Sequence, residues 1–287
     1  MIRLISAELF KLRKRSMTRI LLWVLLGMTV LFYLLLFAIV QANVSLPNPS
    51  AAENMQNALG LPNAVPFALN VLSSFGTVLA IILAASAIGS EYNWRTIRVM
   101  LTSSESRFKL LSAKLISVVI LILIGMVVGL FGGFIMSLIT TAIGGYTFDF
   151  SFATDEYLWD QFLQFWRTFS VLAPYMLLGF LFAIAGRSVM PGIALGIGIL
   201  FLEGFFTFFM ILAGGWIARI PDYLLSVNVD AITALNDLPQ GFGGGPMGGG
   251  FSSQAPEISH AFIVLAGYSL VFIVLAFYLF RKRDVTG

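Results

Sequence analysis

The chain has 287 residues, of which 59% are hydrophobic and 11% are charged, and its formal net charge is +3. Soluble domains carry about 25% charged residues, so this composition excludes a purely soluble globular protein. The small net charge gives no argument for nucleic-acid binding. Because the chain has no cysteine, it has no disulfide framework, thiolate metal site or thiol nucleophile.

The first segment, residues 1–16, is predicted to form an amphipathic helix at the membrane interface. Ile2, Ile5, Leu9 and Leu12 recur at helical spacing, and basic residues occupy the other faces. Such a helix lies in the membrane surface with its apolar face toward the lipid. The alternative is a basic tail that only orients the first span, and the two interpretations do not exclude each other.

Six long apolar runs, which contain a single charged residue between them, predict six transmembrane helices. About 20 such residues cross a bilayer, and backbone amides in lipid must be satisfied within their own helix. The predicted spans are residues 20–41, 67–89, 115–144, 168–186, 190–214 and 260–280. The expected fold class is therefore an all-α, polytopic membrane protein, with one transmembrane domain over residues 1–287.

The placement of positive charge predicts the orientation of these spans. Fifteen of the 17 Lys and Arg residues fall in the segments on one side. Because such segments stay in the cytoplasm during insertion, we expect a multi-pass protein of the plasma membrane with both termini cytoplasmic. Residues 90–113 would then form a cytoplasmic loop, and residues 215–259 an outer loop.

Rows of glycine predict close contact between helices. Gly125, Gly129 and Gly133 form two overlapping GxxxG steps on the third span, and Gly192 with Gly196 forms one on the fifth. Small residues at this spacing let helix backbones approach each other in lipid. The spacing alone does not distinguish packing within the chain from contact with a second chain.

The predicted cytoplasmic loop is longer than a simple connection. It has 24 residues, whereas helix connections commonly have about 2–8. Trp94, Ile97, Arg98 and Leu101 follow helical spacing within it. We therefore expect a helical hairpin that makes contacts of its own.

Several kinds of chemistry are excluded by the residues present. A phosphate-binding P-loop needs a Lys followed by Ser or Thr, and none of the lysines is followed by either. His260 is the only histidine, so the chain has no multi-histidine metal cluster or HExxH motif. We therefore predict no catalytic residue, no metal site and no cofactor on this chain.

The order of segments resembles the permease subunits of type-2 ATP-binding-cassette (ABC) exporters. A basic amphipathic helix, a span, an outer loop and a second span are followed by an acidic residue, a threonine, a leucine-rich turn, an arginine and a lysine that opens the third span. The residues that match this pattern are Glu91, Thr96, Leu101, Arg107 and Lys114. Arg95 stands where the family usually has glycine, and Ser104 where it has proline.

This resemblance implies a permease that forms the export pathway, pairs with a second permease chain as a homodimer or heterodimer, and docks onto a separate ATP-binding subunit. ATP hydrolysis would take place on that subunit, so this chain is not expected to be an enzyme. The transported substrate does not follow from the resemblance. The residues expected to couple to the ATPase are Glu91, Tyr92, Trp94, Thr96, Ile97, Arg98, Leu101 and Arg107.

Glu203 is the one charged residue inside a predicted span. An ionised side chain facing lipid is costly, so we expect it to face the helix bundle or a water-filled pathway. It would serve as a neutral group bonded to a neighbouring helix through Tyr175 or Asn70, as a pathway residue that contacts cargo, or as a proton-coupling site.

Two further functions compete with the ABC permease. One is a proton-coupled secondary transporter that uses Glu203, and the other is an ATP-independent scaffold subunit of a larger membrane complex. Both predict the same apolar helices, but neither requires an ATPase partner.

The predicted topology is tested with single cysteines introduced at Ser104 and Ser252 of this cysteine-free chain. A membrane-impermeant thiol reagent added to intact cells should label Ser252→Cys, whereas Ser104→Cys should react only after the membrane is opened, since the positive charges hold its loop inside. Labelling of both cysteines from outside would exclude this topology.

Overall fold

A computed structural model of the chain describes residues 1–42, 58–93, 106–144, 148, 150–236 and 256–282. Helices account for every regular element in these residues, and none of these residues is in a strand. The all-α prediction is confirmed. The core of the predicted loop, residues 94–105, and the glycine-rich stretch at 241–250 lie outside the described residues.

The described elements are α1 (Ile2–Lys14), α2 (Ser16–Gln41), η1 (Leu61–Asn63), α4 (Ala64–Val71), η2 (Leu72–Gly76), α5 (Thr77–Asn93), α7 (Arg107–Gly144), α8 (Asp155–Gly186), α9 (Val189–Ala213), η3 (Ile217–Tyr223), α10 (Leu225–Thr233) and α11 (Ile258–Lys282). Six helices in this part of the chain are long and apolar enough to cross a membrane. The second is composite, because η1, α4, η2 and α5 follow one another from Leu61 to Tyr92. The chain is thus a multi-pass membrane protein by the length and composition of its helices.

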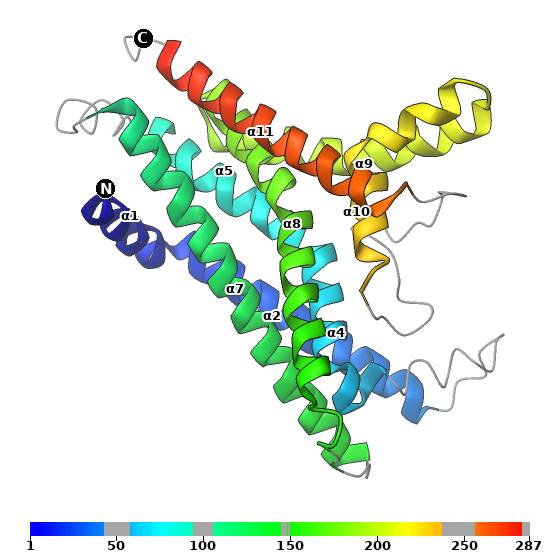
Figure 1. Cartoon of the computed structure of the whole chain (residues 1–287). Coiled ribbons are helices and arrows are strands. Elements are labelled where there is room, and N and C mark those ends of the chain that lie inside the picture. The colour runs from blue at the N-terminus through cyan, green and yellow to red at the C-terminus, as the bar shows by residue number, and fades with distance from the viewer. Residues whose placement is uncertain (43–57, 94–105, 145–147, 149, 237–255, 283–287) are drawn as a thin grey trace.

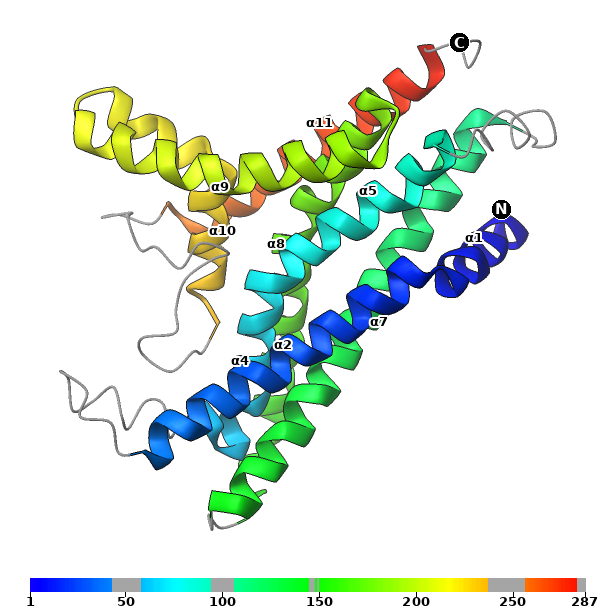
Figure 2. The ribbon, with the colours of Figure 1, turned by 180° about the vertical axis from the view of Figure 1, so that it is seen from behind.

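The start of α1 and the end of α11 lie at the same end of the bundle (Figures 1 and 2). We call this the inner end, and the opposite end the outer end. The short helix α1 also lies at the inner end, beside the first part of α7 (Figure 2). This arrangement agrees with an even number of crossings between the termini.

Helix α8 begins well before the predicted span at residues 168–186. Thr154 precedes it, and the Thr154 hydroxyl accepts a hydrogen bond from the Tyr157 amide at 3.2 Å. Asp155 and Glu156 occupy the first turn, where the helix dipole stabilises a negative charge. A search for uncharged runs misses this turn because these same acids interrupt the apolar pattern.

Two helical elements occur inside the predicted outer loop. They are η3 and α10, and α10 packs against α11 and α8. The sequence predicts residues 215–259 only as a loop, so these short helices in its described part are an addition to that prediction.

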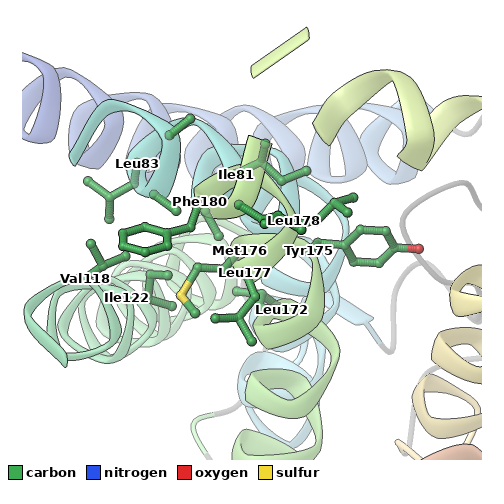
Figure 3. Close-up of a cluster of buried hydrophobic side chains, with 14 of the residues drawn as sticks. Ile81, Leu83, Val118, Ile122, Leu172, Tyr175, Met176, Leu177, Leu178 and Phe180 are labelled. Carbon is green, nitrogen blue, oxygen red and sulfur yellow. The ribbon is translucent and has the colours of Figure 1, made fainter. Parts of the chain in front are cut away.

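Helix α8 supplies much of the bundle's core. It packs against α5 on one side and against α9 and α11 on others. Phe180 and Met176 of α8 meet Ile81 of α5 and Val118 of α7 in a cluster of buried side chains (Figure 3). Tyr175 leaves the same stretch of α8 and points away from this cluster (Figure 3).

Four of the five glycines in the predicted rows pack against another helix of the chain, and Gly125 does not. A Cβ added at Gly133 of α7 would lie 2.5 Å from the Cβ of Ala68 in α4. One added at Gly196 of α9 would lie 2.6 Å from Ile81 of α5, and one at Gly192 would lie 2.7 Å from Ala85. These glycines are therefore needed for helix contacts inside one chain.

The close contact at Gly133 predicts a loss of stability on substitution. Gly133→Leu should lower the free energy of unfolding by about 1–3 kcal/mol or more, because the added side chain must displace the backbone of α4. Thermal unfolding of the detergent-solubilised protein measures this. Gly198→Leu is the matched control, since nothing lies within 4 Å of a Cβ added there. Equal melting temperatures for the two variants would contradict the packing described.

Candidate functional site

The candidate site is at the inner end of the bundle, where α1 packs against α7. Arg15 separates α1 from α2 with an extended backbone, φ −68° and ψ 136°, so the chain changes direction there. Glu8 and Leu12 are the buried residues of α1, one turn apart. The predicted helix is present, but Ile2 is 84% exposed and the buried face holds a carboxylate.

Lys114 of α7 is the centre of a buried ionic cluster. Its ammonium donates hydrogen bonds to Glu8 Oε2 at 2.6 Å and to Glu91 Oε1 at 2.7 Å. Lys11 of α1 also donates a hydrogen bond to Glu91 Oε1. Lys114 and Glu91 are fully buried, and Glu8 is 6% exposed. The cluster therefore connects three segments that are distant in sequence: α1, the end of α5 and the start of α7.

Arg15 extends this cluster toward α2. Its guanidinium lies 3.7 Å from Glu91 Oε1 and donates a 2.5 Å hydrogen bond to the Ser90 hydroxyl. A second hydrogen bond runs from Arg15 to the Ser86 carbonyl at 3.3 Å. Burial lowers the pKa of Arg15, and the negative charges of Glu91 and Glu8 oppose that shift.

The cluster combines two carboxylates with three cations. Burying a charge is costly unless it is paired and hydrogen-bonded, and the direct contacts to Lys114 meet that condition. Nothing in this arrangement has the character of a reaction centre. The cluster instead has a structural character: its ion pairs hold α1, the end of α5 and the start of α7 together.

The predicted coupling residues have separate locations in the structure. Glu91 was expected on a docking surface, but it is fully buried in the ionic cluster. Tyr92 is partly buried against the apolar core. Arg107 donates a hydrogen bond to the Arg281 carbonyl at 3.3 Å, which connects the start of α7 to the end of α11. The predicted coupling residues outside the described part of the chain are Trp94, Thr96, Ile97, Arg98 and Leu101.

Sequence reasoning missed Glu8 as a site residue. A weak signal was present, because Glu8 is three positions before Lys11 and four before Leu12, on the face that packs. A carboxylate among the apolar positions of an amphipathic helix indicates a buried cation on the partner helix. The identity of that cation, Lys114, depends on a contact between residues 106 positions apart.

Glu203 lies on α9, next to the start of α10. Its carboxylate is against the backbone amides of Leu225 and Ser226, the first two residues of α10. Amides in the first turn have no partner within the helix, and a negative charge there is favourable. Tyr175, one of the two partners named from the sequence, is adjacent. This environment favours a structural role in which Glu203 fixes α10 against α9.

Metal ligands are not gathered anywhere in the described segments. No group of three or more His, Asp or Glu side chains in them is arranged to hold a metal ion. The ionic cluster is also unsuited to one, because three cations already surround its carboxylates.

The ionic cluster predicts a strong effect of removing its central cation. Lys114→Met should lower the free energy of unfolding by about 3–5 kcal/mol, because Glu8 and Glu91 would lose their closest buried partner. Lys14→Met is the matched control, since Lys14 is exposed on α1. Chemical denaturation in detergent, followed by tryptophan fluorescence, measures both. A loss of similar size in both variants would contradict the central role of Lys114.

The position of Glu203 predicts a difference between two substitutions. Glu203→Gln keeps the shape and polarity of the side chain beside the start of α10, so its stability should stay close to that of the parent. Glu203→Leu replaces this polar group with an apolar one and should cost about 0.5–2 kcal/mol. Thermal unfolding compares the two. A well-folded Glu203→Gln protein with no transport would instead show that the negative charge acts in the pathway.

The comparisons with known proteins find a family match and a similar protein. Residues 54–286 match the family described as "Protein of unknown function (DUF2705)". The chain is also similar to "Uncharacterized protein YhcI" of Bacillus subtilis (strain 168), with 26% identity over 224 residues. That alignment covers 73% of this chain and 64% of the relative, so the chain spans less than two thirds of the relative's length. Because the family match includes most of the sequence and five of the six membrane helices, the chain belongs to the DUF2705 family.

Proposed function

We propose that this chain is the membrane-spanning subunit of an ABC exporter in the plasma membrane. In this proposal, the chain forms the export pathway with a second permease chain, and a separate subunit binds and hydrolyses ATP. The inner end of the bundle faces the cytoplasm, as the positive charges predict.

One observation carries the proposal furthest: the hydrogen bond between Glu91 and Lys114. Both residues match the exporter pattern, one on α5 before residues 94–105 and one on α7 after them. Their side chains meet at 2.7 Å, so α5 and α7 are fastened together at these positions. A displacement of the predicted coupling segment between them would therefore act on both helices, which is what coupling to an ATPase requires.

Helix α1 is attached to the same ionic contact. Glu8 contacts Lys114 and Lys11 contacts Glu91, so α1 must follow any movement of the end of α5 or the start of α7. The buried Glu91 then acts as an anchor for the predicted coupling segment, whereas direct contact with the ATPase is assigned to Trp94 and Ile97 within that segment. The coupling role of Glu91 is therefore indirect.

The exposed apolar surface of α9 supports the proposal that a second permease chain binds. Its outer half exposes aromatic side chains around more than one face of the helix, including Phe201, Phe205, Phe206 and Phe209. Lipid or the helices of another permease chain cover such a surface in a membrane protein. Gly192 and Gly196 of α9 already pack within the chain, so in this proposal contact with another chain involves these aromatic residues.

The proposal is tested by purifying the tagged full-length chain from its native membranes in mild detergent. A P-loop subunit should copurify in constant stoichiometry, and the complex in nanodiscs should hydrolyse ATP. Trp94→Ala should weaken the association by about 2 kcal/mol or more, since buried aromatic residues dominate such interfaces. Ile97→Asp combined with Leu101→Asp should abolish both copurification and ATP hydrolysis.

Phe148→Asp combined with Phe150→Asp is the matched control. It makes the same chemical change at two exposed positions that follow α7 at its outer end, and it should leave the association intact. Transport by the chain in membranes that hold no ATPase would favour the secondary transporter. A constant set of partners without a P-loop subunit would favour the scaffold.

A further inference from the structure

A cavity of about 500 Å³ lies between α2, α5 and α7. This volume is within the range of roughly 300–1,000 Å³ that is typical of small-molecule sites. In Figure 2, α2 passes in front of α7, and α5 lies beside α2. Apolar side chains from all three helices form the walls, among them Leu25, Leu79 and Ile122. The interior therefore matches hydrocarbon rather than a polar solute.

The inner end of the cavity is basic. Arg13, Thr18 and Arg19 line it there, at the corner where α1 meets α2. Both arginines are exposed, and neither has a carboxylate within 4.0 Å in the described part of the chain. Arg15, between them in sequence, is instead committed to Glu91 and Ser90. Two cations thus remain available at the entrance.

Backbone features keep the cavity open. Gly76 of η2 and Gly125 of α7 both line it, and nothing lies within 4 Å of a Cβ added at Gly125. Gly76 is the last residue of η2, which is a single π-helical turn within the second span. Such turns are frequent at functional sites. The lining of the second span runs from Leu72 to Leu83, about 16 Å at 1.5 Å per residue. The cavity is therefore elongated along the helices.

We propose that this cavity binds one acyl chain of an anionic phospholipid from the inner leaflet, with the lipid phosphate held by Arg13 and Arg19. An apolar slot that runs into the bilayer and has two unpaired cations at the membrane surface is complementary to the two ends of such a lipid. Ile20 and Trp23 of α2, near the basic end of the cavity, are exposed, and lipid would cover them in a membrane. The proposal concerns the chain itself and does not depend on an ATPase partner.

The test uses the purified full-length chain in a neutral detergent with dioleoylphosphatidylglycerol or dioleoylphosphatidylcholine as the added lipid. Native mass spectrometry measures bound lipid, and thermal unfolding measures stabilisation. We expect phosphatidylglycerol to bind one per chain and to raise the melting temperature more than phosphatidylcholine does. Arg13→Gln combined with Arg19→Gln should weaken phosphatidylglycerol binding about 30-fold and remove the preference, since each basic residue near a membrane surface attracts anionic lipid.

Arg3→Gln combined with Lys14→Gln is the charge-matched control on α1. These residues are exposed and do not line the cavity, so the preference for phosphatidylglycerol should persist. An equal loss of phosphatidylglycerol binding in both double variants would overturn the proposal, because it would show that the basic surface as a whole attracts the lipid. Unchanged binding after the loss of Arg13 and Arg19 would overturn it as well.

Gly125→Leu tests the acyl-chain site separately. Leucine fits the open space, so the lipid-free protein should fold normally while the bound phosphatidylglycerol is lost. Gly198→Leu, also at a glycine with open surroundings, should keep it. Retention of the lipid by Gly125→Leu would overturn the proposal. A shift of Gly125→Leu from dimer to monomer with unchanged lipid content would overturn it in favour of a second chain as the occupant.

Discussion

The inner end of this membrane protein depends on one buried ammonium group. Lys114 lies inside the bundle and is held by Glu8 from α1 and Glu91 from α5. Removing Lys114 takes the closest buried partner from both carboxylates, which costs several times more than losing an exposed ion pair. The position of α1 and the spacing of α5 and α7 are therefore fixed together rather than one by one.

This ionic contact and the glycine contacts contribute different things. Gly133 and Gly192 allow helices to approach closely, and their energy comes from dispersion between well-packed atoms. Apolar contacts of this kind tolerate small shifts along a helix. The directional hydrogen bonds of Lys114 do not, because a shift by one residue would turn its side chain away from Glu91. The charges therefore specify the register that close packing then stabilises.

Much of the fold follows from the sequence because length and hydropathy alone decide which segments are able to cross a bilayer. The start of α8 was not predicted, since Asp155 and Glu156 cap a helix but also end an uncharged run. The site was harder to predict. Lys114 was noted as a residue that opens a span, and Glu91 as part of a loop motif, but their pairing with Glu8 depends on long-range contacts that no local pattern shows.

The corner between α1 and α2 brings the ionic cluster and the apolar cavity together. Arg15 belongs to the cluster, while Arg13 and Arg19 line the cavity on either side of it in sequence. Helix α1 cannot swing away from α7 without separating Glu8 from Lys114, and the same movement would carry Arg13 away from the cavity. Arg13 of the cavity and Glu8 of the ionic cluster are thus both placed by one short helix. A change at either site must therefore act on the other through the position of α1.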